Sequence, residues 1–178
     1  EFAALCNEAH KLGMKVILDG VFSHTGSNSV YFDRNRVFGH GAISDPNSPF
    51  RSWFDFQEYP NRYTSWWGID TLPCVNEMDP TYLEYIISGP NSVIAHWLGL
   101  GADGFRLDVA DELPDAFITL FRKHLKELNP DALLLGEVWE DASNKISYGA
   151  RRKYFSDGEL DSVMNYPFRS AILSFMAH

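Results

Sequence analysis

The sequence has 178 residues, of which 45% are hydrophobic and 22% charged, and acidic residues outnumber basic ones by 24 to 15. This composition is typical of a globular domain and excludes a disordered chain and a collagen-like fibre. The net charge of -9 argues against nucleic acid as a partner, and no apolar run approaches the roughly 18 residues of a membrane span, so we expect neither partner.

The first part of the chain predicts a helix, a strand and then a long irregular segment. Apolar residues recur at three- and four-residue steps over 1–12, which indicates a helix that Gly13 ends. A short β-branched run over 15–22 predicts a buried strand. Periodicity then disappears over 23–80, where glycine, proline and aromatic residues are frequent. Because the aromatic residues argue against disorder, we predict a small folded insertion there.

Strands and helices alternate again after residue 80, which gives four strand-then-helix units in all. This order predicts a parallel sheet with right-handed crossovers. We therefore predict one domain formed by 1–22 and 81–178, interrupted by a small inserted domain over 23–80. The expected elements are a helix over 82–100 broken near Gly89-Pro90, strands over 103–110, 132–139 and 160–165, helices over 114–128 and 167–176, and an irregularly helical stretch after residue 139.

The two cysteines, Cys6 and Cys74, have no partner at metal-ligand spacing. We interpret them as buried free thiols in preference to a disulfide, because small residues such as cysteine are commonly buried.

Three predicted strands each carry one carboxylate near the C-terminal end, namely Asp19, Asp108 and Glu137. Burying a lone charge is costly, so such groups are paired, metal-bound or functional. A structural ion pair of Arg106 with Asp108 or Asp19 would explain any one strand equally well. Three successive strands with the same pattern favour a functional site, because the C-terminal rim of a parallel sheet is where α/β enzymes bind substrates.

Asp108 and Glu137 are separated by one strand-helix-strand period, which places them on neighbouring strands. Two carboxylates across a short gap suit cleavage of a glycosidic bond, one as nucleophile and one as acid. Aromatic side chains stack on the apolar faces of sugars, although for any single aromatic residue a place in the core of the insertion is the commoner role. The candidate platform residues are Trp53, Tyr63, Trp66 and Trp67.

Four short segments carry a resemblance to a known family. They are 19–24 (DGVFSH), 72–76 (LPCVN), 104–110 (GFRLDVA) and 136–139 (GEVW). Together and in this order they resemble conserved blocks of the α-amylase family of glycoside hydrolases (family thirteen). The second segment resembles the form found in neopullulanases, cyclomaltodextrinases and maltogenic amylases, and the likeness covers essentially the whole chain.

The resemblance implies an α/β fold, a partial (β/α)8 TIM barrel of about strands three to six, with a small irregular domain after the first visible strand. It implies a retaining hydrolase that cleaves α-glucosidic bonds, mainly α-1,4, in starch-like polysaccharides, maltooligosaccharides, pullulan or cyclodextrins. Matched position by position, Asp108 is the nucleophile and Glu137 the general acid/base, and Arg106 orients the nucleophile. The supporting and substrate-binding residues it implies are Asp19, His24, Arg106, Asp111, Glu112 and Trp139.

The sequence departs from the family pattern in three places. Ser23 replaces an Asn that often takes part in a calcium site, so we expect no cofactor, with calcium left open. Asp111 replaces an Asn on the acceptor side, which bears on the balance of hydrolysis and transfer. The family's fourth block, with the third catalytic carboxylate, does not occur before His178. We therefore expect this central segment alone to be inactive and to self-associate. The subgroup resemblance favours a cytoplasmic over a secreted protein.

Two alternatives belong to other functional classes. The first is a non-catalytic, amylase-like accessory or binding subunit, which loss of Asp108 or Glu137 would favour; both are present. The second is a metal-dependent hydrolase with Asp19, His24 and Glu137 as ligands, which lacks a second histidine at suitable spacing.

The retaining mechanism sets two further expectations for the carboxylates. Their carboxyl groups should lie roughly 5–5.5 Å apart, against about 6.5–9.5 Å for inversion. The neighbouring Arg106 should keep Asp108 ionised, while apolar neighbours should raise the pKa of Glu137.

Overall fold

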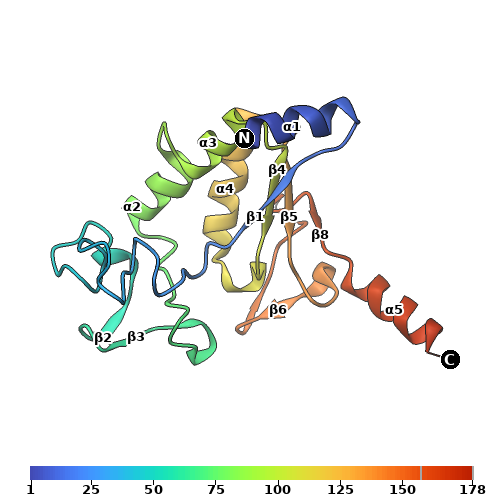
Figure 1. The fold of residues 1–178 in the computed structure, drawn as a ribbon. Coiled ribbons are helices and arrows are strands. Elements are labelled where there is room, and N and C mark those ends of the chain that lie inside the picture. Colours follow the sequence, from blue (N-terminus) through green and yellow to red (C-terminus); the bar gives the residue numbers. More distant parts are fainter. Residues whose placement is uncertain (157, 178) are drawn as a thin grey trace. The chain divides into compact units, whose positions relative to one another are not determined.

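The computed structural model describes residues 1–156 and 158–177 (Figure 1). The chain divides into two compact units, one formed by Glu1–Gly20 with Tyr85–His178 and the other by Val21–Glu84. The independence of the insertion as a separate domain stays a prediction. In the part of the chain that the structure describes, no helix combines the length and the apolar character needed to cross a membrane.

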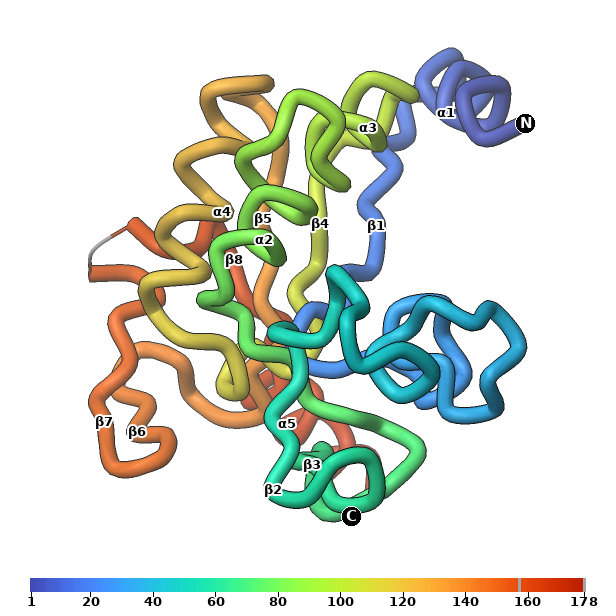
Figure 2. The backbone as a smooth tube through the Cα atoms, turned by 90° about the vertical axis from the view of Figure 1, so that its left-hand side faces the viewer, coloured from blue at the N-terminus to red at the C-terminus, as the bar shows by residue number. Residues whose placement is uncertain are grey.

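The first unit is built on a four-stranded parallel sheet whose strands lie side by side in chain order (Figures 1 and 2). The predicted parallel sheet is therefore confirmed. The strands are shorter than predicted, and two of them end before their carboxylates, so that Asp108 and Glu137 follow a strand end. The strands are β1 (Ile17–Gly20), β4 (Gly104–Leu107), β5 (Leu133–Gly136) and β8 (Ser162–Val163).

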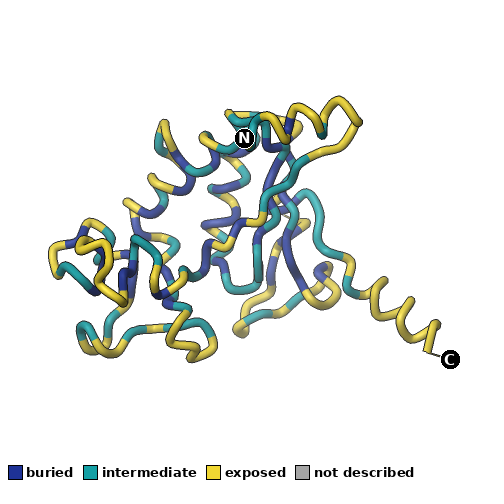
Figure 3. The backbone as a smooth tube through the Cα atoms, in the orientation of Figure 1, coloured by how far each residue is buried: buried dark blue, intermediate teal, exposed yellow. Residues whose placement is uncertain are grey.

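Helices alternate with these strands, as the periodicity predicts. They are α1 (Phe2–Lys11), α3 (Val93–Gly99), α4 (Asp115–Leu128) and α5 (Tyr166–Met176), and a π-helical turn over Glu84–Ser88 precedes α3, so the expected break is present. The ring of Phe121 on α4 packs edge-on against Phe105 of β4, with centroids 5.4 Å apart. By contrast, α5 has no fully buried residue, and it is exposed from Pro167 onward (Figure 3).

The stretch after residue 139 is not the irregular helix that we expected. After a short 3₁₀ turn over Ala142–Asn144, the strands β6 (Ile146–Ser147) and β7 (Ala150–Arg151) form an antiparallel hairpin. Tyr148 and Gly149 connect them with φ angles of 51° and 77°. Two successive left-handed residues form a tight hairpin turn and cannot continue a helix, so the prediction was wrong here.

The second unit has little regular structure and a core of aromatic rings. It contains α2 (Pro80–Leu83) and the antiparallel pair β2 (Phe56–Glu58) and β3 (Arg62–Tyr63). Phe32 and Trp53 are buried there, so Trp53 is a core residue. Both cysteines are free, as expected, although only Cys6 is buried and Cys74 is half-buried.

At the amino end of the sheet, Asp103 fastens α1 and β1 to the start of β4. Its carboxylate accepts hydrogen bonds from the Val16 amide (2.8 Å) and the Lys15 amine (2.9 Å) and pairs with the His10 ring (2.7 Å). Burial raises the pKa of Asp103, but these hydrogen bonds outweigh burial and lower it to about 2.

We expect Gly104→Ala to be strongly destabilising. Gly104 has a φ of 151°, and a Cβ there would lie 2.1 Å from the Leu133 carbonyl oxygen, so β4 and β5 would have to separate. The free energy of unfolding should fall by about 3 kcal/mol or more, measured by urea titration. The control is Gly99→Ala at the exposed end of α3, where a Cβ meets nothing within 4 Å. Equal effects of the two substitutions would contradict the role given to Gly104.

Candidate active site

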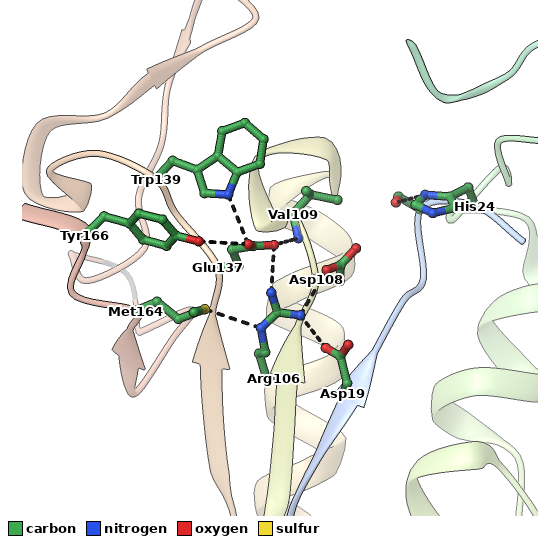
Figure 4. A network of polar contacts seen from close by, with 10 residues as sticks. Asp19, His24, Arg106, Asp108, Val109, Glu137, Trp139, Met164 and Tyr166 are labelled. Atoms are coloured by element: carbon green, nitrogen blue, oxygen red, sulfur yellow. Dashed lines mark hydrogen bonds and ion pairs between the residues drawn. The ribbon is translucent and has the colours of Figure 1, made fainter. Parts of the chain in front are cut away.

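One arginine joins the carboxylates at the carboxyl ends of the strands (Figure 4). Arg106 lies directly beside Asp19 in the register of β1 and β4. Its Nη1 donates to Asp19 and to Asp108, the latter at 2.9 Å, and its Nη2 lies 2.9 Å from Glu137 Oε2. The structure thus brings together four residues that the sequence singled out.

Glu137 is held at both of its carboxylate oxygens. Oε2 accepts a hydrogen bond from the Val109 amide at 2.9 Å and pairs with Arg106. Oε1 accepts from the Trp139 indole at 3.0 Å and from the Tyr166 hydroxyl at 3.2 Å. The Glu137 side chain is only 10% exposed, so these donors replace most of its water.

The amide that reaches Glu137 belongs to a strained residue. Val109 has a φ of 38° and a ψ of 60°, in the left-handed region that a β-branched residue avoids. This turn leads from β4 into a 3₁₀ turn over Ala110–Glu112. The prediction that Ala110 belongs to the strand was therefore wrong. Such strain costs about 1–3 kcal/mol and is common where a site needs a special backbone direction. Here the direction aims an N–H at a carboxylate.

The expected raised pKa of Glu137 is wrong for this structure. Burial raises the pKa, but hydrogen bonds from Trp139 and the Val109 amide, the charge of Arg106 and the Tyr166 hydroxyl outweigh burial and hold it below the ordinary value. The sequence showed the apolar neighbours Leu135 and Trp139 but not that the indole donates a hydrogen bond. Arg106 itself has a raised pKa: burial lowers it, while the hydrogen bonds to Asp19 and Asp108 prevail.

Asp111 and Glu112 contact the β6–β7 hairpin and its flanks. Asp111 accepts from the Tyr154 hydroxyl and pairs with Lys145 at 3.1 Å, and Glu112 accepts from the Tyr148 hydroxyl at 2.6 Å. Burial and the bond to Asp111 raise the pKa of Tyr154. The hairpin therefore fixes both acids, and their role toward an acceptor stays a prediction.

His24 belongs to the second unit, where it is part of an aromatic stack. Its Nδ1 is hydrogen bonded to the Ser23 hydroxyl at 2.9 Å. Its ring stacks on Trp66 with centroids 5.2 Å apart, and Trp66 stacks on Trp67 at 4.6 Å. Trp67 is 64% exposed, so the stack reaches the surface of the second unit. Contact of His24 with a sugar stays a prediction.

Three residues of the site were not found from the sequence. Tyr166 donates to Glu137, the Val109 amide does likewise, and Met164 Sδ accepts from Arg106 Nε at 3.3 Å. Met164 directly follows the short strand β8 and Tyr166 begins α5 two residues later, so the strand-end argument, applied to the fourth strand as well, would have pointed to this segment. No sequence signal marks a backbone amide.

Comparison with known proteins decides the family. The family model described as "Alpha amylase, catalytic domain" matches residues 1–178. The chain belongs to the α-amylase family.

Relatives of this α-amylase family member carry the subgroup names that its second motif suggested. Neopullulanase 2 of Thermoactinomyces vulgaris is 36% identical over 99% of the chain and 28% of its own length, and a cyclomaltodextrinase of a Bacillus species is 33% identical over 98% and 29%. The ligand-free cyclic α-maltosyl-(1→6)-maltose hydrolase of Arthrobacter globiformis superposes with a TM-score of 0.80 at 25% identity, over 98% of this chain and 37% of that one. The fold is thus a partial (β/α)8 barrel, and the chain spans less than a third of the two named relatives.

Position 23 does not supply the amide oxygen that α-amylase family members often contribute to a calcium site there. Calcium prefers six to eight oxygen ligands. Ser23 is 3% exposed and its hydroxyl is hydrogen bonded to His24. The described residues contain no group of three or more acidic, histidine or cysteine side chains suited to a metal ion.

Trp139→Phe should raise the pKa of Glu137, because it keeps the ring and removes the indole donor. In the folded wild type the pKa lies below the ordinary value of 4.5, so ionised Glu137 stabilises the fold above that pH and less as pH falls through the folded pKa. The loss of unfolding free energy caused by Trp139→Phe should therefore be largest above about pH 5 and shrink in acid. Urea titrations over this range measure it. Trp97→Phe on α3 is the control, and an equal pH dependence there would contradict the assignment.

Proposed function

We propose that the full-length protein is a retaining glycoside hydrolase acting on α-glucans. The observation that supports this most directly is the Arg106 guanidinium shared by Asp108 and Glu137 at adjacent strand ends. The arginine donates to the Asp108 carboxylate, the group that would attack the sugar, and so orients it. The relatives named neopullulanase and cyclomaltodextrinase favour pullulan- and cyclodextrin-like α-glucans as the substrate class.

In the first step, a carboxylate oxygen of Asp108 attacks the anomeric carbon as the glycosidic carbon–oxygen bond breaks. The leaving oxygen takes its electron pair and the proton of Glu137. In the second step, water attacks the anomeric carbon and gives its proton to Glu137, and the bond to Asp108 breaks. Two inversions at one carbon give net retention.

Glu137 must be protonated to serve as the acid, and its resting environment favours the carboxylate. A neutral sugar over the site would exclude water and so strengthen burial, the one effect that already raises this pKa. The proton is therefore gained as substrate binds. Trp139 is 46% exposed and offers the sugar an aromatic surface next to the acid.

The mechanism is tested in the full-length enzyme with two isosteric variants. Asp108→Asn and Glu137→Gln should each lower kcat on pullulan or a cyclodextrin by about 10³-fold or more, because each removes a reacting group. Asp141→Asn is the control, an exposed acid that, among the described residues, contacts only Ser143. Proton NMR of the first product formed by the wild type should show the α-anomer. A β-anomer would exclude retention, and full activity of Asp108→Asn would favour the non-catalytic alternative.

We also propose that residues 1–178, prepared alone, are inactive and self-associate. β1 and β8 form the edges of the sheet, and exposed strand edges invite pairing. In addition, α5 presents exposed Phe168, Leu173 and Phe175. Light scattering at micromolar concentration should show a mass above that of the monomer. A monodisperse monomer would contradict the association, and turnover of a maltooligosaccharide would contradict the inactivity.

A further inference from the structure

A cavity of about 420 Å³ lies within the second unit, among residues that no step of the proposed mechanism uses. Its volume is in the range of sites that bind small organic molecules. Three arginines line it, together with a single acidic residue, although the chain as a whole has a net charge of -9. The lining residues are Arg34, Arg36, Ile43, Pro60, Asn61, Arg62, Tyr63, Ser65 and Asp70.

The charges of this cavity do not cancel. Asp70 pairs with Arg34 at 2.9 Å, and Tyr63 donates to the Asp70 backbone carbonyl at 2.7 Å. The side chains of Arg36 and Arg62 are exposed and, in the described part of the chain, form neither an ion pair nor a hydrogen bond. Two of the three lining arginines thus have no counter-charge among the described residues.

The loop that carries Arg34 and Arg36 is rigidly built. Asp33 is 1% exposed, and its carboxylate accepts from the Val37 amide at 2.7 Å and from the Gly39 amide at 2.8 Å. Asp33 and Arg36 have φ angles of 57° and 56°, strained for residues with a Cβ. The loop also packs closely, because a Cβ on Gly41 would lie 2.3 Å from Asp33 Cβ. The conformation of this loop is therefore supported by contacts within the second unit itself.

We propose that this cavity binds a phosphate monoester of a sugar. Such an ester carries a charge of about -1.5 to -2 at neutral pH, which matches two unpaired guanidinium groups better than a single carboxylate would. Guanidinium groups bind phosphate oxygens in a bidentate manner. The Asn61 amide and the Ser65 hydroxyl suit sugar hydroxyl groups, and Ile43 and Pro60 offer an apolar wall. The ligand is either a free sugar phosphate or a phosphate-bearing unit of a glucan.

Binding is measured by calorimetry on the full-length protein at low ionic strength, with four probes. Glucose 6-phosphate should bind about ten-fold or more tightly than inorganic phosphate, and glucose should not bind at this site, because both the anion and the sugar contribute. A maltooligosaccharide with one 6-phosphate group separates the two sources. Tighter binding than glucose 6-phosphate supports a glucan ester as the ligand, and weaker binding supports the free sugar phosphate.

Arg36→Gln and Arg62→Gln should each weaken glucose 6-phosphate binding by about ten-fold. The double variant Arg36→Lys/Arg62→Lys should weaken binding less than the double variant Arg36→Gln/Arg62→Gln, because lysine keeps the charge and loses only the bidentate contact. The control for net charge is Lys11→Gln/Lys123→Gln, on exposed faces of α1 and α4. Circular dichroism confirms that each variant is folded.

Three results would overturn the proposal. The first is that Lys11→Gln/Lys123→Gln weakens glucose 6-phosphate binding as much as Arg36→Gln/Arg62→Gln does. The second is unchanged binding in both Arg36→Gln and Arg62→Gln. The third is equal affinity of the wild type for inorganic phosphate and glucose 6-phosphate. Turnover of an unphosphorylated glucan by the wild type reports the proposed hydrolase function separately, so the two proposals fail independently.

Discussion

The site depends on one cation shared by three carboxylates. Arg106 contacts Asp19, Asp108 and Glu137, and its side chain is only 22% exposed. Arg106 without the acids, or Glu137 without the arginine, would leave a largely buried charge uncompensated, which costs several kcal/mol. The contacts require β1, β4 and β5 to keep their register, since a slip of one residue turns each side chain to the opposite face of the sheet. The close approach of Gly104 to Leu133 fixes that register from the other end of the strands.

The two ends of the sheet use acidic residues differently. At the amino ends, Asp103 binds backbone amides and neighbouring cations, and Asp161 accepts from the Leu134 amide and pairs with Arg122 and Lys126. The partners of both carboxylates are backbone amides and basic side chains of the same unit. At the carboxyl ends the acids surround a single arginine, and Asp19 keeps an exposed fraction of 59%. The structural acids thus bind backbone amides and separate cations, whereas the acids of the candidate site converge on one shared arginine.

Much of this arrangement could be predicted from the sequence. The periodicity of the predicted strands located four residues at the C-terminal rim of the sheet, because the alternation of side chains and the order of the strands can both be read from the hydrophobic pattern. These residues are Asp19, Arg106, Asp108 and Glu137. The lowered pKa of Glu137 could not be predicted. It depends on hydrogen-bond donors that come from the strained backbone at Val109 and from Tyr166, which lies after β8. The β6–β7 hairpin was also missed, because its strands have two residues each and too few to show alternation. Trp53 was a candidate platform by composition and is a core residue by burial.

The strained turn at Val109 has a consequence for how such a site evolves. The donor that it offers to Glu137 is a main-chain N–H, which every residue except proline possesses, so ordinary substitutions at this position preserve the hydrogen bond. Trp139 and Tyr166 donate through side chains and are lost by a single base change or restored by another. The pKa of Glu137 therefore depends on two donors that substitution can remove and on one that it cannot, so this pKa can diverge among related sequences without a change in the backbone that holds the carboxylate.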